Sequence, residues 1–325
     1  MFFAFSLVAL LCWSGSDFFS KKGTDEKDKN SHWKVAFAVG LIMGIHFIIT
    51  LIGGAIIDAN GGPDAVPKFV ASLFYTDFGI MDFVYYLPVA ALYILAMVIG
   101  YIGLRYIELS VSSPICNCSG SLALLICAVI FWGEITLDVW SIVGVCLITL
   151  GIIGIGVVDS RENQELKELR RQDSNRKYTK SILALLLPIA YLIIDALGTV
   201  GDEVLFSFES ISISDYAANS AFEFTFLLVA VFAFIWVKFV KKDSLFKRVN
   251  GSLYLGGLCE TLGQVFYMAV MFADYSVGMV IISAYCAMSL VWGRLFLKEK
   301  LSYKHYIAIA VVFAGIVLLG IFSPV

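Results

Sequence analysis

The sequence predicts an all-α, polytopic membrane protein with ten transmembrane helices, arranged as two inverted five-helix repeats. Three observations support this prediction. Hydrophobic residues make up 60% of the 325 residues and charged residues only 15%, and the mean hydropathy is +0.88, whereas soluble domains are about 45–50% apolar and about 25% charged. The apolar residues fall into ten long stretches, and the basic residues are concentrated in alternate connectors between these stretches.

Ten stretches approach the length that a membrane-spanning helix needs, which is about 20 predominantly apolar residues. They span residues 2–20, 35–57, 81–104, 109–132, 139–158, 181–201, 214–237, 252–273, 276–297 and 305–322. The first is expected to be a retained helix and not a signal peptide, because it lacks a basic leading region and a small-residue cleavage site. The charged segment 159–180 separates residues 1–158 from residues 181–325. We expect it to be a cytoplasmic linker between two repeats, the alternative being an ordinary loop in an unrepeated protein.

The distribution of basic residues predicts the orientation. All but one of the 23 Lys and Arg fall in or beside the odd-numbered connectors, and only Lys68 lies on the other side. The positive-inside rule then places the odd connectors in the cytoplasm and both termini outside the cell (plasma or inner) membrane. Five spans per half is an odd number, so two similar halves must be inverted relative to each other. Equivalent connectors should then differ in charge, and segment 21–34 has five Lys while its counterpart 202–213 has no basic residue.

Similar motifs occur near the ends of the two halves. Segment 104–151 contains LRYIELSVSS, FWGEITLDVW and GVCLITLG, and segment 271–320 contains MFADYSVGMV, LFLKEKLSYKHY and FAGIVLLG. The best marker in each is the glutamate before the last span, Glu134 or Glu299. With these motifs the chain resembles the drug/metabolite transporter superfamily, EamA type. The resemblance implies ten helices, alternating access and a small-metabolite substrate, but it supplies no binding site.

Four carboxylates lie inside the predicted spans: Asp17, Asp195, Glu223 and Glu260. An ionised side chain at the bilayer centre costs about 2.5–3.5 kcal/mol on insertion scales, so such residues are functional candidates. Asp17 has an alternative role as an anchor, because Lys21 follows one helical turn later. We expect Glu260 to recognise charge or to carry a coupled proton, with Asp195 and Glu223 as its partners.

Polar residues recur at helical spacing on three of the predicted spans. The rows include Tyr191 and Asp195 in the sixth span, Asn219 and Glu223 in the seventh, and Glu260, Gln264 and Tyr267 in the eighth. A lipid-facing surface does not carry such rows, so these faces should point into the bundle. Substrate binding is one interpretation, and hydrogen bonds that hold the helices together are the other.

Aromatic residues and the placement of charge suggest the substrate class. Tyr93 and Tyr285 fall within spans, and tyrosine faces beside carboxylates suit an ammonium group. The span cores contain no Lys or Arg, which a phosphate-bearing substrate would require. Asn117 lies in the fourth span and is a further binding candidate. His46 stands alone in the second span and is either a proton relay or a hydrogen-bonded core residue.

The leading hypothesis is a secondary transporter that moves a small polar, cationic or zwitterionic metabolite by alternating access, with proton coupling through Glu260, Asp195 or His46. The alternatives are a facilitator of a neutral sugar-like solute and a receptor that does not transport. No ATP-binding loop or metal-spaced motif occurs, so we expect no enzymatic activity, cofactor, metal site or nucleic-acid partner. The expected partners are the substrate and the lipid bilayer. Small residues such as Gly40 and Gly44 fit either helix packing within the chain or a homodimer.

Overall fold

The computed structural model describes residues 2–25, 27–131, 139–161, 182–208, 211–247, 250–271 and 281–322, and the regular structure in these ranges is helical. The helices are α1 Phe2–Gly23, α2 Ser31–Ala59, α3 Lys68–Phe74, α4 Ile80–Gly103, α5 Leu109–Cys116, α6 Ser119–Ile130, α7 Val139–Arg161, α9 Leu186–Phe206, α10 Asp215–Ile235, α11 Gly251–Met271, α13 Tyr285–Phe296 and α14 Tyr303–Phe322. Short turns of 3-10 helix occupy η1 Pro63–Ala65 and η2 Ile182–Leu185, and π-helix occupies η3 Trp236–Val240. Glu134 and the linker 159–180, except for its first residues at the end of α7, lie outside the described residues.

Five of the described helical segments are long and apolar enough to cross a membrane: Phe3–Gly23, Ser31–Ala59, Ile80–Gly103, Leu109–Ile130 and Asp215–Val240. The chain is therefore a helical, multi-pass membrane protein. The other five predicted spans also contain helices, namely α7, α9, α11, α13 and α14. These are shorter or more polar over their length, so the count of ten remains a prediction.

The surface of α2 shows the pattern that a lipid environment produces. Ile48, Ile52 and Ile56 follow one another at intervals of four residues and are 50–59% exposed. Val39 and Met43, on another face of α2, are almost completely buried in the bundle. A stripe of large apolar side chains this exposed is unusual in a soluble monomer and is expected where acyl chains cover it.

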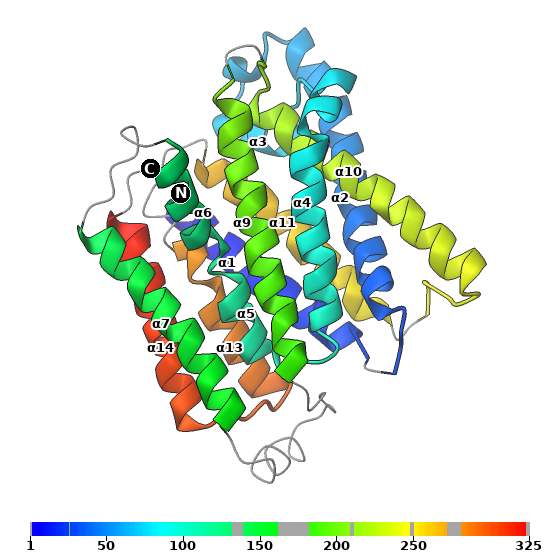
Figure 1. Cartoon of the computed structure of the whole chain (residues 1–325). Coiled ribbons are helices and arrows are strands. Elements are labelled where there is room, and N and C mark those ends of the chain that lie inside the picture. Colours follow the sequence, from blue (N-terminus) through cyan, green and yellow to red (C-terminus); the bar gives the residue numbers. More distant parts are fainter. Residues whose placement is uncertain are drawn as a thin grey trace.

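The helices pack in pairs that join segments distant in sequence (Figure 1). The main contacts are α1 with α11, α4 with α9, α2 with α10 and α11, α10 with α4, α1 with α13, α9 with α5 and α6, α5 with α13, and α7 with α14. The pair α7 and α14 lies at one edge of the bundle, at the left of Figure 1. The end of α7 and the start of α9 lie at the same end of the bundle, whereas η1 and α3 lie at the other.

Glycines allow two of these pairs to approach closely. A Cβ atom on Gly40 of α2 would lie 2.3 Å from the carbonyl oxygen of Phe226 in α10. A Cβ atom on Gly151 of α7 would lie 2.4 Å from Cγ2 of Val312 in α14. Small residues permit this backbone approach between helices in a membrane. These glycines are thus used for packing within the chain, and a homodimer remains a prediction with no support from them.

The fourth predicted span is broken, whereas the sequence indicated a continuous helix over 109–132. Helix α5 ends at Cys116 and α6 begins at Ser119. The amide of Cys118 bonds to the carbonyl of Ile115 at 3.2 Å, which is 3-10 geometry. The Pro114 carbonyl that this shift frees accepts a hydrogen bond from the Cys118 thiol at 3.0 Å. Residues 281–283 are likewise separated from α13 by a turn at Ala284.

A buried glutamate fixes the start of α5. Glu299 is 1% exposed, and its two carboxylate oxygens accept hydrogen bonds from the amides of Leu109 and Ser110, each at 2.9 Å. The Ser110 hydroxyl donates a third bond at 2.6 Å. The first amides of a helix have no partner within the helix, and a carboxylate there also stabilises the helix dipole. The marker glutamate of the second half therefore serves as a cap on a helix of the first half.

The connectors at one end of the bundle are joined by ion pairs. Lys34 Nζ lies 2.7 Å from Asp28 Oδ2 and 2.5 Å from Asp243 Oδ2, and Lys247 lies 2.9 Å from Asp243 Oδ1. Hydrogen bonds from Lys34 and Lys247 hold the pKa of the Asp243 carboxyl well below its usual range. These contacts link the first turn of α2, and Asp28 just before it, to the segment that follows α10.

Candidate functional site

A cavity of about 530 Å³ lies between helices of both halves. Its walls come from α1, α4, α5 and α6 on one side of the sequence, and from α9, α10, α11 and residues 282–285 on the other. Binding sites for small molecules are typically about 300–1,000 Å³ in volume. The helices that form the walls also make the main contacts between the halves, so the cavity sits where the two halves meet.

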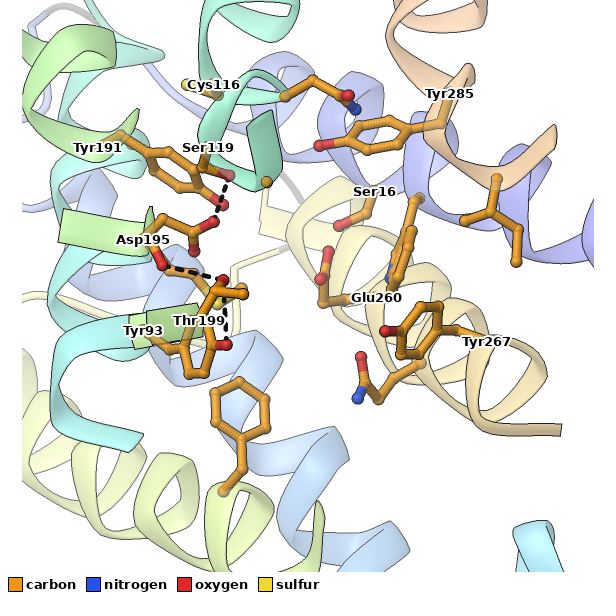
Figure 2. A pocket seen from close by; sticks show the side chains of 18 of the residues that line it. Ser16, Tyr93, Cys116, Ser119, Tyr191, Asp195, Thr199, Glu260, Tyr267 and Tyr285 are labelled. Atoms are coloured by element: carbon orange, nitrogen blue, oxygen red, sulfur yellow. Dashed lines mark hydrogen bonds between the residues drawn. The ribbon is translucent and has the colours of Figure 1, made fainter. Parts of the chain in front are cut away.

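Two carboxylates face each other across the cavity. Glu260 of α11 and Asp195 of α9 point into the same space from opposite sides (Figure 2). Each lies about halfway along its helix, since α9 covers Leu186–Phe206 and α11 covers Gly251–Met271. The Ser119 hydroxyl of α6 donates a hydrogen bond to Asp195 Oδ2 at 2.6 Å. The break between α5 and α6 thus brings a polar group to the acidic centre of the cavity.

Nine of the ten binding residues expected from the sequence line this one cavity. They are Asn117, Tyr93, Tyr191, Asp195, Asn219, Glu260, Gln264, Tyr267 and Tyr285. Helical spacing placed these residues on one face of each helix, and in the structure those faces meet at the same cavity. Their polar character serves both the cavity and the packing, because the amide of Gln264 donates to Asn219 Oδ1 at 3.1 Å and so joins α11 to α10.

Glu223 differs from the expectation that it would bind substrate. Its side chain is fully buried and is not part of the cavity lining. Its oxygens lie 2.8 and 3.0 Å from Nδ1 of His46 in α2, and Asn219 donates to it at 3.3 Å. At this level α10 packs against α2. Asn219 on this face of α10 therefore lines the cavity, whereas Glu223, one turn later, pairs with the buried His46. His46 is also outside the cavity lining, and its pairing makes it a partner of Glu223.

Two further carboxylates line the cavity: Asp17, which the sequence left open as a site or an anchor, and Asp202, which was not expected. Asp17 lines the cavity and accepts hydrogen bonds from Ser113 at 2.6 Å and Ser289 at 2.8 Å. Asp202 also lines it and accepts a bond from the Tyr93 hydroxyl at 2.6 Å. Asp202 lies seven residues after Asp195 and so on the same helix face, a signal that was obscured because it was assigned to the connector after the sixth span.

Lys21, the suggested partner of Asp17, is fully buried. Its ammonium group donates hydrogen bonds to the carbonyls of Leu104 and Ile107, where α4 ends. A lysine near the end of a helix can satisfy the last carbonyls and interact favourably with the helix dipole. Lys21 therefore ties α1 to the end of α4 and is not among the residues that line the cavity.

The charge of the lining is of one sign. Its carboxylates are Asp17, Asp195, Asp202, Asp215 and Glu260, and no Lys, Arg or His is found in that part of the lining that the structure describes. Aromatic rings surround these groups, and the Trp13 ring centroid lies 5.2 Å from that of Tyr267 and 5.9 Å from that of Tyr285. Carboxylates with aromatic faces attract organic cations through charge and cation–π interactions.

The described residues contain no group of three or more His, Cys, Asp or Glu arranged to hold a metal ion. Comparison of the whole sequence with models of known protein families gives no match, and comparison with curated proteins gives none either. The interpretation of the cavity therefore depends on the residues that line it.

Proposed function

We propose that this chain is a secondary transporter for a small organic cation, built from two inverted five-helix repeats of the drug/metabolite transporter type. The observation that carries the proposal is the cavity between the halves, with five carboxylates and no basic side chain in its described lining. Buried acids are costly in a membrane protein unless they are paired, and they commonly mark substrate or ion pathways.

The packing of the helices supports inverted repeats. If residues 1–158 and 181–325 are equivalent, α1 corresponds to α9, α2 to α10, α4 to α11, α5 with α6 to α13, and α7 to α14. Under this exchange the contact of α1 with α11 becomes that of α9 with α4, and the contact of α2 with α11 becomes that of α10 with α4. The contacts α2 with α10, α5 with α13 and α7 with α14 map onto themselves. The principal contacts thus form a two-fold pattern.

Two hydrogen bonds follow the same exchange. Asp195 on the first helix of the second half accepts a bond from Ser119 on the fourth span of the first half, at 2.6 Å. Asp17 on the first helix of the first half accepts a bond from Ser289 on the fourth span of the second half, at 2.8 Å. Each half thus places a carboxylate against a hydroxyl of the other half at the cavity.

In this proposal the halves rock around the cavity and expose it to each side in turn. The breaks at 117–118 and at 284 lie beside the cavity. Each divides a predicted span into two helical segments next to the cavity wall. Glu260 is central to recognition, because it faces Asp195 and its charge interacts with those of Asp17 and Asp195. A proton bound to one of these acids when the substrate leaves would couple transport to the proton gradient.

The experiment has two stages. Thermal stabilisation of the purified protein is first compared for choline, alanine and glucose, and we expect choline to stabilise most. Uptake of labelled choline into proteoliposomes is then measured for the wild type and for Glu260→Gln, with Glu203→Gln as the control because Glu203 is exposed and outside the cavity lining. Loss of uptake in Glu260→Gln alone supports the proposal. Stabilisation by glucose, or uptake unchanged by Glu260→Gln, contradicts it.

A further inference from the structure

The five carboxylates of the cavity form two groups. The inner group is Asp17, Asp195 and Glu260, and the charges of these residues interact. The outer group is Asp202 and Asp215, whose charges also interact, and Asp202 interacts in addition with Asp195 of the inner group. Asp195 and Asp202 are seven residues apart on α9, which places them on one face and about 10.5 Å apart along the helix axis.

One buried polar atom that makes no hydrogen bond belongs to the outer group, and another lies next to the inner group. Asp202 Oδ2 accepts the hydrogen bond from Tyr93, and the Tyr86 hydroxyl also interacts with this carboxylate, but the buried Oδ1 atom itself makes no hydrogen bond of good geometry within the described ranges. The Tyr101 side chain lines the cavity near Asp17 and Glu260 and is 8% exposed, and its buried hydroxyl also has no partner within the described ranges. Buried polar atoms in native proteins are nearly always satisfied, so both positions point to a polar ligand group.

Part of the cavity lining is apolar and aromatic, and it includes Tyr93, whose hydroxyl donates to Thr199 and Asp202 of α9. Phe222 and Tyr93 lie with their ring centroids 6.2 Å apart, and Tyr267 and Met268 come from α11 on the other side. Such a surface suits a chain of methylene groups. The lining described here offers no cation to a substrate carboxylate, which weighs against amino acids and other zwitterions.

We infer that the cavity binds an elongated diamine, with one ammonium group at the inner carboxylates and the other at the outer carboxylates. The inference rests on the proposed transport function and narrows its substrate class. An extended alkyl chain advances by roughly 1.25 Å per bond, as follows from C–C bonds of about 1.5 Å. A separation of about 10.5 Å therefore matches diamines with six to eight methylene groups.

The test is a binding series on the full-length protein in detergent. The probes are α,ω-diaminoalkanes from ethane to decane, with hexylamine as the monoamine. We expect affinity to be highest between the hexane and octane diamines, and to exceed that of hexylamine by roughly tenfold or more, since a hydrogen bond to a charged group contributes about 1.5–3 kcal/mol. A series with no dependence on length, or equal affinity for hexylamine and diaminohexane, overturns the inference.

Two variants locate the second ammonium group. Asp202→Asn should remove most of the preference for diaminohexane over hexylamine, because the carboxylate assigned to the second ammonium group is then absent. Glu203→Gln, at the exposed neighbouring position, should keep the preference. An unchanged preference in Asp202→Asn overturns the inference. Transport of hexylamine and diaminohexane at equal rates would also overturn the diamine inference, but it would be consistent with the transporter proposal. Absence of any amine flux would refute the transporter proposal itself.

Discussion

Replacing Glu299 with alanine should destabilise the protein strongly, although Glu299 does not line the cavity. The substitution removes the acceptor of three hydrogen bonds, two from the amides of Leu109 and Ser110 and one from the Ser110 hydroxyl. The two amides belong to the first residues of α5. The glutamate that accepts their hydrogen bonds is 1% exposed, so water does not readily take its place.

The size of the effect follows from these contacts. An unsatisfied buried donor costs about 1–3 kcal/mol, and two orphaned amides would cost about twice that. Removal of the buried charge recovers part of this amount. The expected loss is therefore about 2–4 kcal/mol, above the range of about 0.5–2 kcal/mol for an ordinary helix cap. Glu299→Gln should lose less, because its amide oxygen still accepts one of the backbone bonds.

The assay is reversible unfolding in mixed micelles with increasing denaturing detergent. Lys304→Ala is the matched control, because Lys304 is exposed near the same loop and should change stability by no more than about 0.5 kcal/mol. If Glu299→Ala unfolds at the same midpoint as the control, the hydrogen bonds at the start of α5 do not stabilise the protein.

Three further predictions concern other parts of the chain. Glu223→Ala should lower the free energy of unfolding by about 3–5 kcal/mol, because it breaks the buried pair with His46. It should change amine affinity little in a binding assay. A selective loss of amine affinity would contradict the assignment of Glu223 as a packing residue. In single-cysteine variants, maleimide labelling of Cys116, which lines the cavity, should be slowed by diaminohexane, while labelling of the exposed Cys146 should not; equal protection would exclude the cavity as the binding site. The depressed pKa of Asp243 means that its contribution to stability is complete above its unfolded value of about 3.9 and is lost as pH falls through the folded pKa. The stability difference between wild type and Asp243→Asn should therefore shrink below about pH 4, and a constant difference from neutral pH to pH 2 would contradict the ion-pair assignment.

Helical periodicity was sufficient to identify nine of the residues that line the cavity, although the full lining is much larger. Glu260, Gln264 and Tyr267 lie at spacings that place them on one face, and a polar face on a membrane helix must point inward. The same rule did not separate Asn219 from Glu223. The two share a face of α10, but His46, which holds Glu223, is 177 residues away in sequence, and a one-dimensional pattern carries no information on such a pairing.

Other features depended on the path of the backbone. Asp202 was assigned to a connector, but α9 continues to Phe206 and carries it into the cavity. Pro114 lies in the fourth span, yet the break occurs three residues later, where the backbone changes to 3-10 geometry. Glu299 was noted as a family marker, and its role as a cap became evident only from its contact with the start of α5.

Counterflow in proteoliposomes shows whether the cavity carries an organic cation across the membrane. Vesicles containing the protein are preloaded with unlabelled choline or diaminohexane, and the same compound is added outside in labelled form at low concentration. If the protein is a transporter, we expect transient accumulation of label in preloaded vesicles, little in empty vesicles, and none with Glu260→Gln. Binding of the amine to the purified protein without any accumulation would contradict it and would indicate a receptor.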